Sequence, residues 1–153
     1  MDARMATATP EPFEVYTPRP QRERRRPFVV VADDSPDMRG LIEDVLVSED
    51  MEVITVASGA RALEVMVDRP PDLLVTDLLM PGMSGFSLRA LMLQRPDLAG
   101  IPVVVLSAYW HRPSETLDVE EVLTKPIDID RFVQVVRRLV GVPAAAETRA
   151  DGV

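Results

Sequence analysis

Apolar residues follow two alternating patterns between residues 27 and 141. Short, nearly all-apolar runs such as Phe28–Ala32 predict strands that are buried on both faces of a sheet. Longer stretches with apolar residues three or four positions apart predict amphipathic helices. The predicted strands cover residues 28–32, 53–57, 73–76, 102–106 and 119–123, and the predicted helices follow the capping residues Ser35, Ser58, Ser84 and Asp128.

The alternation of strands and helices predicts an α/β fold with a doubly wound parallel sheet. Such a sheet binds its ligands beyond the carboxyl ends of the strands, near the point where the strand order switches. In the helix after Ser84 we expect Phe86, Ala90 and Leu93 to face the core. The last helix carries one apolar stripe, formed by Ile129, Phe132, Val133, Val136 and Val140.

The two ends of the chain lack this periodicity. Residues 1–26 are rich in Pro, Thr and Glu and finish in an arginine-rich run, so we expect a disordered arm there and a second disordered tail over residues 142–153. The arginine-rich run could contact an acidic partner, although a solvated arm is the more typical reading. One domain, residues 27–141, is therefore expected.

Composition and charge narrow the classes of function. The net charge of −8 over 153 residues argues against nucleic acid as the main partner and suits a divalent cation. The absence of cysteine excludes disulfides and thiolate metal sites. Apolar runs such as Ile101–Leu106 are too short to cross a membrane, and the N-terminus lacks the pattern of a secretion signal, so a cytoplasmic location is expected.

Polar residues stand where four of the predicted strands end. Asp33 and Asp34 follow the first strand, Asp77 ends the third, Ser107 ends the fourth and Lys125, the only lysine beside 16 arginines, follows the fifth. In a parallel sheet these residues meet at one edge, although they lie up to 92 positions apart. Three carboxylates raise one another's proton affinity, and Mg²⁺ relieves that repulsion with the oxygen ligands it prefers.

Such a cluster suits phosphoryl transfer. A carboxylate beside a metal ion and an ammonium group can act as a nucleophile towards phosphorus. The metal and Lys125 would neutralise the transferring phosphoryl group, and Ser107 could donate a hydrogen bond to it. Ala108 is small enough to leave the approach open.

Four short motifs follow one another along the chain: Asp33-Asp34, Val-Thr-Asp77-Leu-Leu-Met-Pro-Gly-Met-Ser-Gly, Val-Leu-Ser107-Ala and Lys125-Pro126. Together they resemble the receiver domain of bacterial two-component response regulators. The resemblance covers about residues 28–140 and implies a flavodoxin-like, five-stranded parallel sheet in the order 2-1-3-4-5. It implies that a sensor histidine kinase, or a phosphotransfer protein, donates the phosphoryl group. The expected protein is a single-domain regulator, not an enzyme beyond its own phosphorylation and dephosphorylation, that signals through a partner protein.

The resemblance also assigns roles to single residues. It makes Asp77 the phosphoacceptor and Ser107, Lys125 and Ala108 the surroundings of the phosphoryl group. The implied Mg²⁺ ligands are Asp34, Asp77 and the main-chain carbonyl of Leu79, with Asp33 acting largely through water.

Each of these residues also has a purely structural interpretation. Asp33 and Asp34 could cap a helix, Asp77 could serve a turn, Ser107 could simply end a strand and Lys125 could be a surface charge. The complete set in order favours the functional interpretation.

Two departures from the family pattern affect the output surface, which usually includes the fourth helix. Ser107 and Lys125 are only 18 positions apart, and the segment Ala108–Val119 contains Pro113, so we expect an irregular fourth helix. Val122 stands where an aromatic switch residue is common.

Other classes of protein remain as alternatives. The first is a receiver-fold scaffold that docks a kinase or another partner with little or no phosphorylation. The second is a metal-dependent phosphatase, which usually needs an acid two residues after the nucleophile, where this chain has Leu79. A dinucleotide-binding protein is disfavoured because no glycine-rich turn follows the first strand.

Crowding of the carboxylates predicts a measurable cost in stability. Asp33→Asn or Asp34→Asn should raise the melting temperature of the metal-free protein, because each removes one of three like charges. Charge optimisation of this kind commonly contributes about 0.5–2 kcal/mol. Thermal unfolding in EDTA measures the change, and an unchanged or lower melting temperature would count against crowding.

Overall fold

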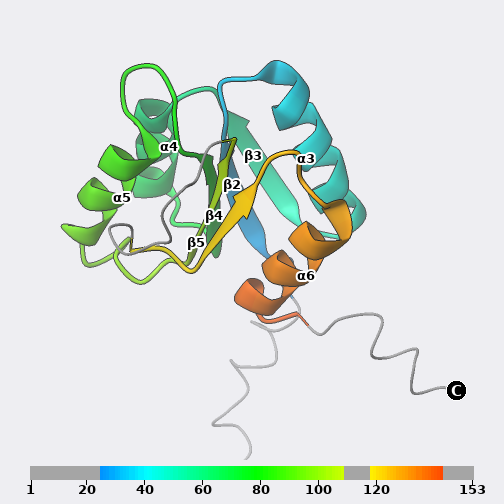
Figure 1. Ribbon diagram of the computed structural model, residues 1–153. Helices are drawn as coiled ribbons and strands as arrows, with labels where there is room; N and C mark the ends of the chain where they lie inside the picture. The colour runs from blue at the N-terminus through cyan, green and yellow to red at the C-terminus, as the bar shows by residue number, and fades with distance from the viewer. Residues whose placement is uncertain (1–24, 109–117, 143–153) are drawn as a thin grey trace, which may run out of the picture.

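The computed structural model describes residues 25–108 and 118–142. They form five parallel strands in one sheet, with helices on both faces (Figure 1). The spatial order β3-β2-β4-β5-β6 confirms the predicted order 2-1-3-4-5 and the flavodoxin-like fold. The strands are β2 (Phe28–Ala32), β3 (Glu52–Val56), β4 (Leu73–Asp77), β5 (Val103–Ser107) and β6 (Glu121–Thr124).

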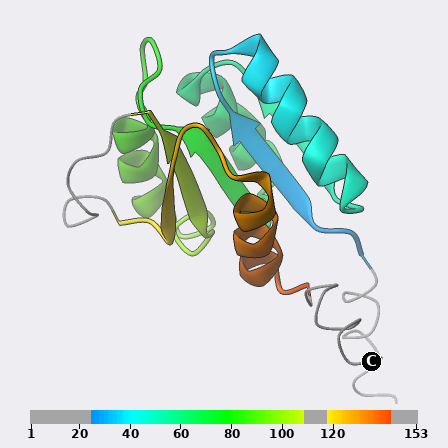
Figure 2. The same ribbon diagram turned by 45° about the vertical axis from the view of Figure 1, so that its right-hand side comes forward.

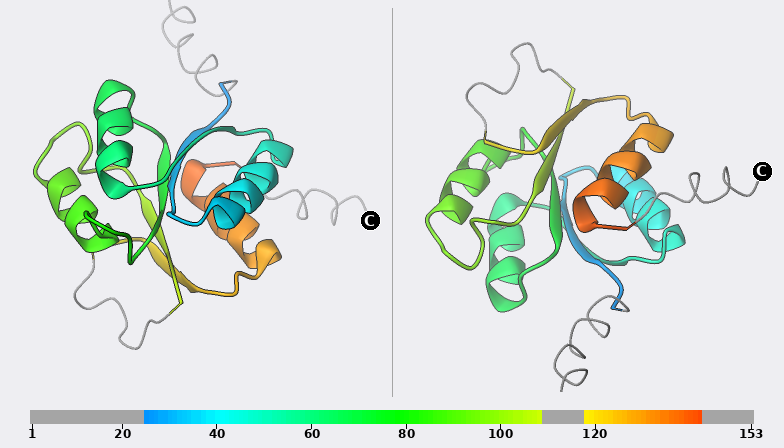
Figure 3. Two further views of the ribbon diagram at one scale, coloured as in Figure 1. Left: turned by 90° about the horizontal axis from the view of Figure 1, so that it is seen from above. Right: turned by 90° about the horizontal axis from the view of Figure 1, so that it is seen from below.

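The helices divide between the two faces of the sheet (Figures 2 and 3). One face packs on α3 (Pro36–Ser48) and α6 (Ile129–Val140), and the other on α4 (Gly59–Asp68) and α5 (Gly85–Leu93). Strand residues alternate between the two resulting cores, so that neighbours in β2 contribute to opposite faces. All five residues of each of β2, β4 and β5 are buried, as the nearly all-apolar runs of β2 and β5 predict, and β4 also buries Thr76 and Asp77.

Each helix begins at the side-chain cap that the sequence predicts. The hydroxyls of Ser35, Ser58 and Ser84 accept hydrogen bonds from backbone N–H groups three residues later, and the carboxylate of Asp128 does the same. Pro36 occupies the first turn of α3, where its missing N–H costs nothing. These caps place the start of each helix close to the carboxyl end of the preceding strand.

The predicted inward face of α5 was wrong. Phe86 and Leu93 are 40% and 43% exposed, and Ala90 is also exposed. The residues that face the core are Gly85, Leu88, Arg89 and Met92.

A buried arginine explains the error: a charged residue lies among the core-facing positions of α5, so these positions do not form a purely apolar stripe in the sequence. Arg89 is 6% exposed, and its guanidinium donates from Nε to the carbonyl of Asp118 (2.6 Å) and from a terminal nitrogen to the carbonyl of Ile101 (3.4 Å). It therefore links α5 to the chain just before β5 and just before β6.

Several predicted boundaries shift by one or two residues. The second predicted strand begins one residue earlier, the fourth one residue later, and the fifth begins at Glu121 rather than at residue 119. The irregular fourth helix expected over residues 108–119 falls mostly on residues 109–117, outside the described residues, as do most of the two predicted tails. Within the described ranges, no helix combines the length and apolar character needed to cross a membrane.

The end of α3 contains an aspartate with a left-handed backbone. Asp50 has φ 64°, and its N–H bonds the carbonyl of Val47 (2.9 Å) while the N–H of Met51 bonds that of Leu46 (3.1 Å). This pair of bonds is the Schellman motif, in which the left-handed position is usually glycine.

We predict that Asp50→Gly stabilises the protein by about 0.5–1 kcal/mol, because glycine adopts this conformation without a Cβ clash. Chemical denaturation measures the change. Asp50→Ala removes the same charge but keeps a Cβ, so it should give no such gain; equal gains from both variants would assign the effect to charge instead.

Candidate functional site

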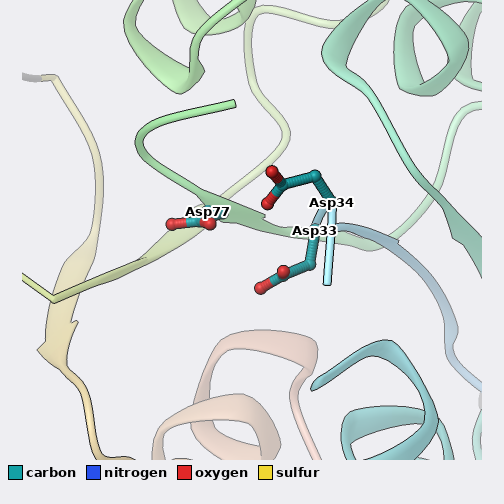
Figure 4. Close-up of side chains that lie close together, drawn as sticks. All are labelled: Asp33, Asp34 and Asp77. Carbon is teal, nitrogen blue, oxygen red and sulfur yellow. The ribbon is translucent and has the colours of Figure 1, made fainter. Parts of the chain in front are cut away.

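Three carboxylates gather at the carboxyl edge of the sheet. Asp33 and Asp34 follow β2 and Asp77 ends β4, and each residue offers an oxygen within 4.8 Å of the other two (Figure 4). Asp33 is fully buried, Asp77 is 9% exposed and Asp34 is exposed. The cluster thus has a closed floor and an open side.

The register of the two central strands brings these residues together. β2 and β4 are hydrogen-bonded neighbours, and Ala32 lies opposite Thr76. The residue that follows each of these two is an aspartate, so Asp33 and Asp77 come side by side. Parallel pairing alone therefore accounts for the closeness of two residues that are 44 positions apart.

Lys125 binds both buried carboxylates. Its Nζ lies 3.3 Å from Oδ2 of Asp33 and 3.4 Å from Oδ2 of Asp77, and its side chain is 21% exposed. Its backbone N–H donates to the carbonyl of Ser107 (2.8 Å), which fixes the chain after β6 against the end of β5. The ammonium group therefore partly neutralises the acids while one side remains accessible to solvent.

Three further predicted residues lie at this edge or in the loop beside it. Ser107 is the last residue of β5, is 1% exposed, and follows Leu106, the residue that pairs with Asp77. Ala108 comes next and is exposed. Leu79, two residues after Asp77, lies in the loop between β4 and α5 with 60% of its surface exposed.

Burial raises the pKa of Asp77 above its ordinary value. The ammonium of Lys125 opposes this shift, the charge of Asp33 adds to it, and the N–H of Leu78 again favours the charged form. The net direction is upward, so the ammonium of Lys125 does not fully offset the cost of burying the charge of Asp77.

The donor set fits a hard divalent cation. When all three acids are ionised, they and Lys125 carry a net charge of −2, and every side-chain ligand is a carboxylate oxygen. A dication would balance that charge and would lower the pKa of Asp77.

A glycine at the start of α5 packs closely against the backbone of the site. A Cβ at Gly85 would lie 2.7 Å from the carbonyl oxygen of Asp77 and 3.1 Å from Cα of Leu78. The N–H of Gly85 donates to the carbonyl of Leu78 (2.8 Å), which closes the loop tightly. Only a residue without a side chain permits this approach.

Sequence reasoning missed Arg39. This half-buried residue in the first turns of α3 donates from its guanidinium to the main-chain carbonyl of Asp33 (2.8 Å). The available signal was its place one turn after the cap Ser35, on a helix that starts at the site. Gly85 was present in the quoted motif but had no assigned role.

The fold is a doubly wound parallel sheet with an acidic cluster at its carboxyl edge, and the sequence assigns the chain to a family. Residues 29–137 match the family described as the response regulator receiver domain. The chain belongs to this family, which serves two-component systems.

Curated relatives share the domain within longer chains. The sensor histidine kinase TmoS of Ectopseudomonas mendocina is 38% identical over 135 residues, which cover 84% of this chain and 14% of that protein. The response regulator PleD of Caulobacter vibrioides is 32% identical over 147 residues, covering 81% of this chain and 32% of the relative. This chain therefore spans about a seventh to a third of the length of these relatives.

Solved structures agree on the fold. A putative response regulator from Chloroflexus aurantiacus has a TM-score of 0.72 and 26% identity, with 76% of this chain and 99% of that chain covered. The receiver domain of the sensor histidine kinase PA1611 from Pseudomonas aeruginosa, described with a magnesium ion coordinated in its active site cleft, has a TM-score of 0.71, with 76% and 99% covered. At 20% identity, the second likeness shows the fold alone.

The raised pKa of Asp77 predicts a pH-dependent stability in EDTA. Because the pKa of Asp77 is higher in the folded than in the unfolded protein, protonation of Asp77 stabilises the fold. This stabilisation is complete below the pKa of the unfolded state, about 3.9, and is lost as the pH rises through the pKa of the folded state. Asp77→Asn should therefore melt at a higher temperature than wild type at pH 8, and the difference should shrink as pH falls towards about 4.

Melting curves across this pH range check the prediction. Asp44→Asn, on the exposed side of α3, is the control for loss of one carboxylate outside the cluster. A difference between Asp77→Asn and wild type that stays constant with pH would contradict it.

Proposed function

We propose that this receiver domain accepts a phosphoryl group on Asp77 from the phosphohistidine of a sensor histidine kinase or phosphotransfer protein, and that Mg²⁺ is required. The observation that carries the proposal is the contact of Lys125 with Asp77 (3.4 Å) beside two further carboxylates at one strand edge.

Asp77 is the nucleophile in this proposal. Its carboxylate oxygen forms a bond to phosphorus while the bond from phosphorus to the histidine nitrogen breaks, which gives an acyl phosphate. Nζ of Lys125, which already contacts Asp77, would then pair with a phosphoryl oxygen after only a small movement. The hydroxyl of Ser107, at the end of the adjacent strand, would donate to another oxygen, and Ala108 would leave room for the donor.

The cation site is built from the same acids. Asp34 and Asp77 would ligate Mg²⁺ directly together with the main-chain carbonyl of Leu79, and the more deeply buried Asp33 would act mainly through water. When bound, the ion neutralises negative charge on the transferring group. The position of Leu79, in the loop that Gly85 holds against the end of β4, is consistent with a carbonyl directed at the same edge.

Phosphorylation would signal through an as yet unidentified protein partner. The added group carries close to two negative charges, enough to disturb the pairing of Lys125 with Asp33 and Asp77. A surface altered in this way is what a partner would read.

One observation favours a second candidate, a scaffold that binds a kinase or another partner without switching. Val122 is half-buried and packs against the core cluster shared by α4 and α5. An aromatic side chain at this position could change between an inward and an outward rotamer, but valine has no ring and cannot act as such a switch.

The proposal predicts covalent phosphorylation. A small-molecule phosphodonor with MgCl₂ should add one phosphoryl group to the intact protein, and mass spectrometry should show no adduct with Asp77→Asn or without the metal. The loss should exceed about 100-fold in rate, because the nucleophile itself is removed. Asp44→Asn, outside the cluster, should behave as wild type.

The absence of an adduct with small donors and with histidine kinases would favour the scaffold. An adduct that persists in Asp77→Asn would place the phosphoacceptor elsewhere.

A further inference from the structure

The guanidinium of Arg39 holds the peptide bond that joins the two consecutive aspartates. It donates to the main-chain carbonyl of Asp33 at 2.8 Å, and this carbonyl belongs to the peptide between Asp33 and Asp34. That peptide lies just beyond β2, where the ladder of strand hydrogen bonds has ended. A side chain from α3 therefore fixes its orientation.

The other groups of Asp33 are also engaged. Its N–H bonds the carbonyl of Val56 (3.1 Å), one carboxylate oxygen accepts from the N–H of Ser35 (2.9 Å), and the other contacts Lys125 (3.3 Å). Asp33 is thus held at every polar atom.

Asp34 is held differently. It is exposed, and within the described residues no hydrogen bond or ion pair to its carboxylate is found. Its side chain nevertheless reaches within 4.8 Å of those of Asp33 and Asp77 (Figure 4). The direction in which it leaves the chain depends on the plane of the preceding peptide, and Arg39 sets that plane.

We infer that Arg39 is a positioning residue for the divalent cation: it orients the Asp33–Asp34 peptide so that Asp34 faces the site before the ion arrives. The inference rests on the proposed function, because it assigns Asp34 to the cation. Groups that orient metal ligands in this way contribute substantially to affinity, since the ligand loses less freedom on binding.

Because Arg39 is positively charged, the direction in which Mg²⁺ affinity changes when it is removed tests the inference. A cation near the site repels Mg²⁺, so its removal strengthens binding if Arg39 is only a neighbouring charge. Removal weakens binding if the hydrogen bond to Asp33 is what matters. The two roles predict opposite changes in the same measurement.

The experiment compares Arg39→Met with wild type in the full chain. Titration calorimetry with MgCl₂, and the rise in melting temperature with MgCl₂ at constant ionic strength, both report the affinity without phosphorylation. We expect the dissociation constant to rise by about tenfold in Arg39→Met. Arg39→Lys keeps the charge and a donor and should recover part of the affinity.

Arg95→Met is the matched control. Arg95 lies after the far end of α5, paired with Asp97 (3.2 Å), so its removal changes the net charge equally without touching the site. Its Mg²⁺ affinity should equal that of wild type.

With a phosphodonor, Arg39→Met should need more Mg²⁺ for half-maximal phosphorylation but reach the wild-type extent at saturation.

Unchanged or tighter Mg²⁺ binding in Arg39→Met overturns the inference while wild-type phosphorylation keeps the proposed function intact. Wild-type protein that neither binds Mg²⁺ nor accepts a phosphoryl group defeats the proposed function itself. If Arg39→Met fails to fold, Arg39→Lys decides the question: it keeps the charge, so weaker binding than wild type supports the inference, and unchanged or tighter binding overturns it.

Discussion

The contact of one ammonium group with two buried carboxylates is the interaction on which the site depends. Asp33 is fully buried and Asp77 nearly so, and a buried carboxylate without a partner is costly enough to become protonated or to distort the fold. Lys125 lowers this cost by lying 3.3 Å and 3.4 Å from the two acids. It does so incompletely, because the pKa of Asp77 remains raised. When its three acids are ionised, this edge carries more negative than positive charge, and such an edge suits a dication.

Much of this arrangement follows from the sequence. The continuous apolar runs predicted strands buried on both faces, and the serines and the aspartate before each helix predicted the caps, which the structure confirms. The strand order came from the family resemblance, because no periodicity within a strand says which strand lies beside it. The closeness of Asp33 to Asp77 needed that order and the register of β2 and β4, neither of which is encoded locally.

The errors and omissions have a common physical cause. Arg89 and Arg39 are charged residues that act through main-chain carbonyls, and a carbonyl leaves no trace in a pattern of side chains. The predicted inward face of α5 left out Arg89 and was therefore turned away from Leu88 and Met92. Gly85 was missed for a related reason, since its importance lies in the atom it lacks.

The close approach of Gly85 to Asp77 has a mechanical consequence. A Cβ at Gly85 would lie 2.7 Å from the carbonyl oxygen of Asp77, so the first residue of α5 packs directly against the end of β4. One turn further on, Arg89 ties the same helix to Asp118, on the approach to β6. One helix thus contacts both the carboxyl end of β4 and the segment just before β6, so a larger residue at position 85 would force α5 or the end of β4 to move.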